Sequence, residues 1–369
     1  MLSPAYLASC PDALVRLCAQ VEQDVLVDMA RRLATYDYYI PSAQHQHQKL
    51  RAMGLMEEEI EAELAKLLNK APDEIRRIMQ DAVSDAIDND AKIYAAAGMG
   101  PIDPVAMAGI RDIIRAGYDQ TGGLFTNLTR TTAHTATLQF EDALDRAWLQ
   151  ISSGGFDYNT AIRRAIGDLS EQGVHAIKYP SGHKDRIEVA IRRAVVTGVN
   201  QTAGLACEHL MDELGVELVE VTAHSGARPE HAEWQGKVYS RKGRTRHYKN
   251  LVDATGYGTG GGLKGWNCSH DFFPYFEGAP RAYTAAQLRE MNAKKITYNG
   301  EKMTEYDALQ KQRAIERAIR RWKRELAACE AAKQPTDHAK AKISEWNAKM
   351  RDFNRQTGLK RDRTREVIG

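Results

Sequence analysis

The chain has 369 residues, of which 43% are hydrophobic and 27% charged, and its mean hydropathy is −0.51. This length is enough for two domains and this composition for a folded core, so a wholly disordered chain is excluded. No apolar stretch approaches the ~18 residues of a membrane span, and the first residues lack the basic start of a secretory signal. The five cysteines are few and widely spaced, which favours reduced thiols and synthesis in a cytoplasm over a disulfide framework.

Charge is unevenly distributed along the chain. Residues 1–100 carry a net charge of −6, whereas residues 301–369 carry +7. A basic segment suits a polyanionic partner, and a solvated helical surface is the alternative explanation.

The first two-thirds of the sequence predicts a series of helices. Apolar residues at spacings of three and four begin near residue 12, and two further segments open after Pro41 and at Pro72, where proline favours a helix start over a helix interior. The same spacing predicts later helices over residues 128–152, 157–172 and 184–214. The middle of the last helix holds poor helix formers, which indicate close packing or a polar contact, with solvent exposure as the alternative: Gly198, Asn200, Gln201 and Thr202.

The pattern changes at residue 216. Apolar and polar residues alternate there with the period of a strand, and short strands are expected at 216–222, 236–240 and 270–275. We therefore expect a small α+β module at about 216–300 and no strands elsewhere. Its core is expected to be aromatic, from Trp234, Trp266, Phe272, Phe273 and Tyr275.

Helices are expected again after residue 300. A helix over 306–330 carries an apolar face and, on the opposite face, an arginine stripe. A second helix is expected after Pro335. The basic segment at the end of the chain is expected to be flexible. The chain is thus predicted to be mainly α with a small α+β module. Its expected domains are 1–215, with a sub-boundary near 98–125, then 216–300 and 301–369.

Four side chains of the module are candidate metal ligands. Imidazole and thiolate suit zinc, and the candidates are His224, His231, Cys268 and His270. Their spacing is not that of a standard zinc finger, and a Cys-x-His pair on a strand would point to opposite faces unless a turn intervenes. The competing interpretation is that these are polar groups satisfied within a small core, with no cofactor.

The glycine-rich segment 256–265 has two interpretations. It superficially resembles a phosphate-binding loop, but no Lys-Ser/Thr pair or helix pattern follows it, and such loops need both. Glycines also allow positive φ angles and close backbone approach, so a structural loop is the favoured interpretation. No nucleophile elbow is present, and catalytic residues are therefore not assigned.

Several blocks of the second half resemble the phage minor capsid protein 2 family. They are RRAVVTGVNQTAG (192–204), AHSGARPEHAEWQGKVYS (223–240), ATGYGTGGGLKGWNCSHDFFPYFEG (254–278), TEYDALQKQRAIERAIRRWKRE (304–325) and RQTGLKRDRTRE (355–366). The family is similar in layout to the Mu F-type head-morphogenesis proteins of tailed phages and prophages. The family signature falls here on His224, Gly226, Arg228, Pro229, His231, Trp234, Gly236, Lys237, Gly256, Gly258, Gly260, Gly265, Trp266, Asn267, Cys268 and His270. The residue after Cys268 is often basic in relatives and is Ser269 here.

The resemblance implies a structural minor capsid protein. It would lie inside the head near the portal, contact portal and other capsid proteins, and act in head assembly, DNA packaging or DNA delivery, with no membrane and no established enzyme activity. Self-association stays open. Non-specific contact with packaged double-stranded DNA, or with an acidic portal surface, is assigned to Arg313, Arg317, Arg320, Arg321, Arg324, Lys360 and Arg361. The alternative function is a metal-dependent hydrolase or toxin-like enzyme built on the 216–300 module.

Overall fold

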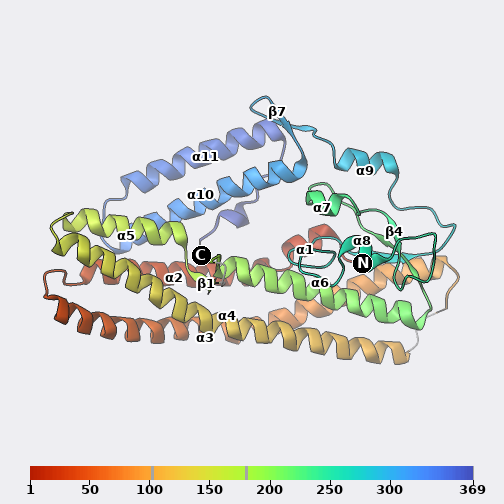
Figure 1. The fold of residues 1–369 in the computed structure, drawn as a ribbon, viewed down its shortest axis with the longest axis horizontal. Coiled ribbons are helices and arrows are strands. Elements are labelled where there is room, and N and C mark those ends of the chain that lie inside the picture. Colours follow the sequence, from red (N-terminus) through yellow and green to blue (C-terminus); the bar gives the residue numbers. More distant parts are fainter. Residues whose placement is uncertain (101–103, 179–181, 369) are drawn as a thin grey trace. The chain divides into compact units, whose positions relative to one another are not determined.

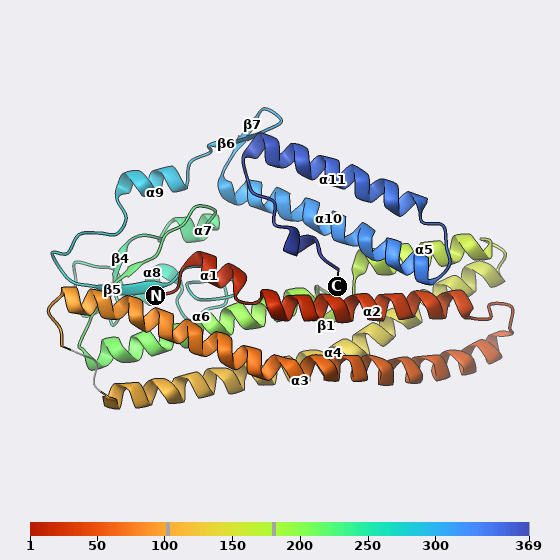
Figure 2. The same cartoon turned by 180° about the vertical axis from the view of Figure 1, so that it is seen from behind.

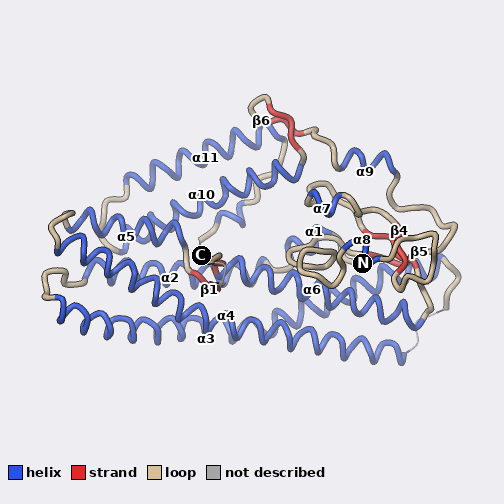
Figure 3. Tube along the Cα trace, viewed as in Figure 1, coloured by secondary structure: helices blue, strands red, loops and turns tan. Residues whose placement is uncertain are grey.

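The computed structural model describes residues 1–100, 104–178 and 182–368. The chain is 67% helical, with few short strands, which confirms the mainly α class with a small β-containing module. Figure 3 shows the strands as short segments between long helices. Among the described residues, no helix is both long and apolar enough to cross a membrane.

The elements follow in chain order (Figure 1). The helices are α1 Pro4–Ser9, α2 Asp12–Thr35, α3 Ser42–Ala96, α4 Pro104–Ser152, α5 Tyr158–Gln172, α6 Ile187–Glu213, α7 Pro229–Ala232, α8 Leu251–Thr255, α9 Ala285–Met291, α10 Glu305–Ala331, α11 Asp337–Thr357 and the short 3-10 helix Arg363–Glu366. The strands are β1 His175–Lys178, β2 Lys184–Arg186, β3 Leu218–Val221, β4 Val238–Ser240, β5 Phe272–Tyr275, β6 Ile296–Tyr298 and β7 Glu301–Met303.

The chain forms two compact units, and each is assembled from three separate stretches. Unit 1 comprises Met1–Asp12, Pro72–Leu124 and Arg192–Gln310, and unit 2 comprises Ala13–Ala71, Phe125–Ile191 and Lys311–Gly369. These units differ from the three contiguous blocks expected from the sequence. Residues 1–215 and 301–369 are each divided between the two units, and residues 216–300 lie in unit 1 together with distant segments. Long helices such as α3 and α4 contribute residues to both units.

Unit 1 contains a three-stranded antiparallel sheet with β3 in the centre, between β4 and β5. These strands fall within the three segments that the alternating pattern predicted. Val219 pairs with Tyr239 on one side and with Pro274 on the other. Because β3 is buried between two neighbours, its apolar residues Val219 and Val221 are fully buried.

Unit 2 is built mainly from helices, and its strands β1 and β2 form one short hairpin. The hairpin of α10 and α11 is visible as two helices side by side in both Figure 1 and Figure 2, and the rings of Trp322 and His338 meet edge to face at 5.2 Å between centroids. The apolar face of α10 is buried as its spacing predicted, with Ile315 and Ile319 inside. α5 also matches its predicted range; the carboxylate of Asp157 caps its first turn and Gly173 ends it with a φ of +68°.

Pro72 does not restart a helix, contrary to expectation. It lies inside α3, which is continuous from Ser42 to Ala96. Buried apolar residues continue in helical spacing on both sides of it, namely Leu64, Ala71, Ile75 and Met79. Packing of this stripe offsets the one hydrogen bond that the proline removes.

Two further expectations need correction. α4 begins at Pro104, not near 128, so Gly122 and Gly123 lie within a helix. Strands are also not confined to 216–300, because β1 and β2 form an antiparallel hairpin before α6, and β7 ends at Met303. The sequences of β1, β2 and β7 are HAIK, KDR and EKM, and none of them alternates between apolar and polar residues.

Candidate metal centre and basic surfaces

The end of the central sheet places the candidate metal ligands together. Cys268 and His270 lie in the turn that leads into β5, His224 follows β3, and His231 lies on α7. The difficulty of the Cys-x-His spacing does not arise, because both residues precede β5, which begins at Phe272. Both side chains are therefore not constrained to opposite faces of a strand.

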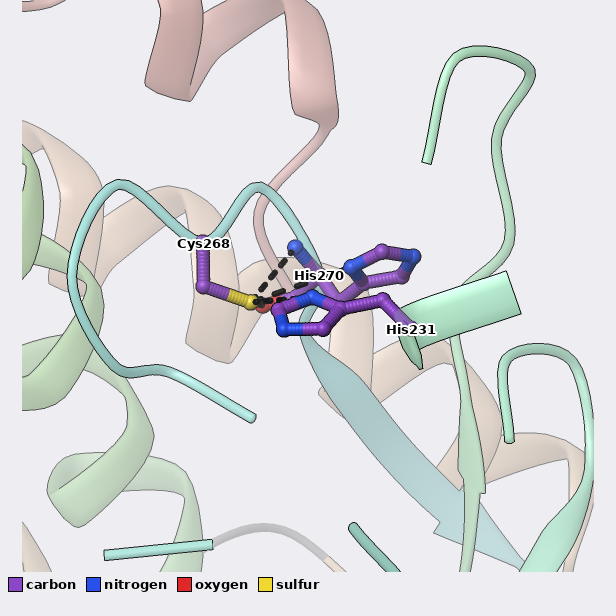
Figure 4. Close-up of side chains that lie close together, drawn as sticks. All are labelled: His231, Cys268 and His270. Atoms are coloured by element: carbon purple, nitrogen blue, oxygen red, sulfur yellow. Dashed lines mark hydrogen bonds between the residues drawn. The ribbon is translucent and has the colours of Figure 1, made fainter. Parts of the chain in front are cut away.

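Three of the four candidates form one buried cluster (Figure 4). The sulfur of Cys268 lies 3.8 Å from Nδ1 of His231 and 3.7 Å from Nδ1 of His270. One ligand atom from each residue lies within 4.8 Å of the other two. All three residues are at most 2% exposed.

Hydrogen bonds fix the orientation of both imidazoles. Nε2 of His231 donates to the carbonyl of Gly261 at 2.9 Å, and Nε2 of His270 donates to Oε1 of Gln235 at 3.0 Å. That Gln235 oxygen also accepts the backbone N–H of His224, while the Gln235 amide nitrogen donates to Asn292. Since both Nε2 atoms carry the proton, each neutral ring turns an unprotonated Nδ1 toward the sulfur.

Burial keeps these groups neutral. It lowers the pKa of His270 to about 2, with the nearby His224 and His231 adding to the effect, and it also lowers the pKa of His231. The same burial raises the pKa of the Cys268 thiol. The cluster therefore presents neutral imidazoles and an unreactive thiol, which does not resemble an activated nucleophile.

His224 lies beside the cluster and not within it. Its ring centroid is 4.4 Å from that of His270, and its Nδ1 donates to the carbonyl of Ser225 at 2.8 Å. Its Nε2 is buried and has no hydrogen-bond partner among the described residues.

The glycine-rich segment is a tightly packed loop in the structure. A side chain at Gly262 or Gly265 would collide with backbone atoms of the same loop, around Gly256 and Gly260. Gly256 ends α8 in a left-handed conformation, with a φ of +63°. The glycines thus permit close backbone approach, as the structural interpretation required.

Other signature residues make contacts within unit 1. Arg228 donates to the carbonyl of Trp266 at 2.7 Å, and Lys237 donates to the carbonyl of Glu233 at 2.5 Å. Gly226 and Gly236 both have positive φ angles, and a side chain at either would press against a leucine.

The aromatic core is smaller than expected. Trp234, Phe272 and Phe273 are buried, and Trp234 meets His270 edge to face at 4.8 Å between centroids. Trp266 is 59% exposed and Tyr275 is only partly buried, so neither fills the core. The ring of Trp266 instead covers Gly260, where an added Cβ would come within 2.6 Å of the indole.

Sequence reasoning missed a polar network that holds the cluster. Lys264 and Asp271 form a fully buried ion pair, and Lys264 also donates to the side-chain oxygen of Asn200 at 3.1 Å. Burial opposes ionisation of Asp271, yet the Lys264 ammonium holds the pKa of that carboxyl below its ordinary value. Asn200 donates to the carbonyls of Cys268 and His270 at 3.0 and 3.2 Å. The polar contact expected in the middle of α6 is therefore present, and the close packing is too, since Gly198 lies against Thr121.

The arginines of α10 do not form the expected exposed stripe. Arg324 is buried and pairs with Glu22 at 3.1 Å, Arg320 pairs with Glu188, and Arg321 lies 3.5 Å from both Glu171 and Glu325. Arg313 and Arg317 are exposed. Arg320, Arg321 and Arg324 therefore pair with acidic side chains of unit 2.

The basic tail packs against α10, whereas the sequence predicted a flexible segment. Arg361 forms an ion pair with Glu366 at 2.5 Å, and the carbonyls of Lys360 and Glu366 accept side-chain hydrogen bonds from Gln312 and Lys323 of α10. The Lys360 side chain itself is exposed.

A second basic segment, residues 241–249, escaped the sequence analysis. This loop, called the basic loop below, follows β4 and is organised by Glu217, whose Oε1 accepts the backbone N–H groups of Lys242 and Arg244 at 3.0 and 3.3 Å. Arg241 and Lys242 pair with Asp212. The remaining cations are exposed and form no ion pair within the described part of the chain: Arg244, Arg246 and Lys249.

Comparisons with known proteins identify the family of this chain. The family described as phage minor capsid protein 2 matches residues 2–354. A protein named "Structural protein" of Lactococcus phage LL-H is 28% identical over 247 residues, which are 64% of each chain, so the match spans less than two thirds of that relative. A second "Structural protein", of Lactococcus phage mv4, is 32% identical over 106 residues, covering 28% of this chain and 77% of the relative. No solved structure matches.

Proposed function

Because this chain belongs to the phage minor capsid protein 2 family and is a structural protein of the virion, we propose that it is a low-copy component at the portal inside the head. It would act there in head assembly, DNA packaging or DNA delivery. The observation that carries the proposal is the family match over residues 2–354, which includes both the helical segments and the small sheet.

Exposed apolar side chains support a role in contacts with other proteins. In unit 2, Tyr39 is 79% exposed, Leu50 66% and Leu149 61%. Burying such side chains against the portal, another capsid protein or a second copy would stabilise an assembly by about 25 cal/mol for each Å² removed from water.

The basic loop is the favoured site for packaged DNA. Its cations Arg244, Arg246 and Lys249 are exposed, whereas Arg320, Arg321 and Arg324 are neutralised within unit 2. No element suited to reading base edges is evident in the loop, so contact would be through phosphates, non-specific and strongly dependent on salt.

The enzyme alternative receives less support. A catalytic zinc site needs an open coordination position that a substrate can reach. The cluster of His231, Cys268 and His270 is buried, and the pKa of its thiol is raised. A structural role therefore fits this cluster better than hydrolysis.

Quantitative mass spectrometry of purified particles tests the proposal. We expect the protein in DNA-filled heads in a fixed ratio to the portal and far below the major capsid protein. We also expect a deletion of its gene to reduce filled heads without abolishing synthesis of the portal. Absence from purified particles, or a copy number like that of the major capsid protein, would contradict the proposal.

A further inference from the structure

We infer that His231, Cys268 and His270 bind a structural zinc ion through Nδ1, Sγ and Nδ1. The separations of 3.8 and 3.7 Å between the sulfur and the two nitrogens are close to those of a tetrahedral site. Zn–S near 2.3 Å and Zn–N near 2.0–2.1 Å place sulfur and nitrogen about 3.5 Å apart. The three ligand atoms lie within 4.8 Å of one another, so the two nitrogens would have to move closer together around the ion. A structural site also needs a fourth ligand, and the unpartnered Nε2 of His224 at the edge of the cluster would supply it.

The hydrogen-bond inventory of the cluster lacks a donor. Both Nδ1 atoms are acceptors, because each Nε2 already donates to an oxygen, on Gly261 or Gln235. The Cys268 thiol has one proton and can satisfy only one of these two lone pairs. A cation would accept electron density from both nitrogens and from the thiolate, so that no buried acceptor is left unsatisfied.

The surroundings are those of metal ligands. Histidine ligands usually donate their second ring N–H to a carbonyl or amide oxygen, as Gly261 and Gln235 provide here. The backbone N–H of His270 points to the Cys268 sulfur at 3.4 Å, which would stabilise a thiolate. The unpartnered Nε2 of His224 is a further buried lone pair at the edge of the cluster.

The donor set selects the metal. Two imidazoles and one thiolate suit zinc, whereas magnesium and calcium prefer oxygen ligands such as carboxylates. Because the ligands are at most 2% exposed, the ion would be closed from substrate and would join α7, the glycine-rich loop and the start of β5. Binding of zinc exchanges the thiol proton for the metal, without any redox step.

The test uses the full chain without an affinity tag, purified from zinc-supplemented cells. Elemental analysis is expected to find one zinc per chain after dialysis, and replacement by Co²⁺ to give near-ultraviolet thiolate-to-metal absorption. Removing zinc with a chelator is expected to lower the melting temperature, and adding Zn²⁺ to restore it. A wild-type chain with far less than one zinc per chain and no Co²⁺ absorption would overturn the inference.

Variants locate the ion. Cys268→Ser and His231→Gln are expected to weaken zinc binding at least tenfold, whereas the buried controls Cys329→Ser and His45→Gln, outside the cluster, keep it. Far-ultraviolet circular dichroism identifies any variant that fails to fold, and the wild-type chelation result then decides. Retention of full zinc affinity by both folded cluster variants would overturn the assignment. None of these results depends on the proposed place at the portal.

Discussion

α10 and the basic loop are both rich in arginine, yet their charges have opposite fates. In α10, Arg324 is buried beside Glu22 and Arg320 pairs with Glu188, so the positive charges stabilise unit 2. In the basic loop, the glutamate at 217 binds backbone N–H groups and leaves the side chains of Arg244 and Arg246 exposed. The number of arginines in a segment therefore does not show which of them are exposed and unpaired, because this depends on where acidic side chains lie in the fold.

Arg324→Met should have the largest effect. It leaves the Glu22 carboxylate buried without its cation, and we expect the free energy of unfolding to fall by about 3–5 kcal/mol. Denaturant unfolding of the purified chain measures this change. The double variant Glu22→Gln/Arg324→Met should lose less than the single one, and a loss below about 1 kcal/mol in the single variant would show that Arg324 is not a buried structural charge.

Replacing Arg244, Arg246 and Lys249 by glutamine should leave stability within about 0.5 kcal/mol of wild type, because these side chains are exposed. DNA affinity should fall, and the slope of log affinity against log salt should become shallower by up to about 2.7 for three lost phosphate contacts. Titration of duplex DNA at several salt concentrations measures both. The matched control replaces Arg313, Arg317 and Lys360 by glutamine; an equal or larger loss of slope in that control would return the DNA contact to the C-terminal region.

Arg321→Gln should have a smaller effect than Arg324→Met. Its side chain is 27% exposed, and its partners Glu171 and Glu325 lie 3.5 Å away, so solvent screens the interaction. We expect the free energy of unfolding to fall by about 0.2–1 kcal/mol, again by denaturant unfolding. A loss equal to that of Arg324→Met would show that the difference in burial does not determine how much each arginine contributes to stability.

Acid should loosen the basic loop. Burial works against ionisation of Glu217, but hydrogen bonds from Ser240, Lys242 and Arg244 hold its pKa below the ordinary glutamate value. A carboxyl whose folded pKa is depressed contributes stability above its unfolded pKa, and this contribution disappears as the pH falls through the folded pKa. The protection factors of the Lys242 and Arg244 amides, which correct exchange rates for their intrinsic pH dependence, should therefore fall on acidification. Glu217→Gln should lower them already at neutral pH, and unchanged protection factors in the variant would contradict this role.

Local sequence patterns predicted most of the secondary structure, but they did not predict the contacts between residues far apart in the sequence. The period-2 alternation placed the three strands around β3, and helical spacing placed α5, α10 and α11. Pro72 within α3 escaped this reasoning because packing on both sides outweighs a local propensity. Glu22 and Arg324 are 302 residues apart in the sequence, so no local pattern could pair them.

Residue type alone identified the candidate metal ligands, but it did not predict which of them lie together or which side chains orient them. The sequence identified His231, Cys268 and His270 but grouped His224 with them, and the structure places His224 beside the cluster. Asn200 and Gln235 orient the cluster through hydrogen bonds. The sequence indicated close packing or a polar contact at Asn200 without its partners, and it gave no signal at Gln235.

Cross-linking of protein to DNA inside intact, filled particles determines whether this chain contacts packaged DNA through the basic loop. Mass spectrometry of the peptides that carry nucleotide adducts locates the contact. We expect adducts in residues 241–249 and none on Arg320, Arg321 or Arg324. Adducts confined to α10, or a filled particle without any adduct on this chain, would contradict it.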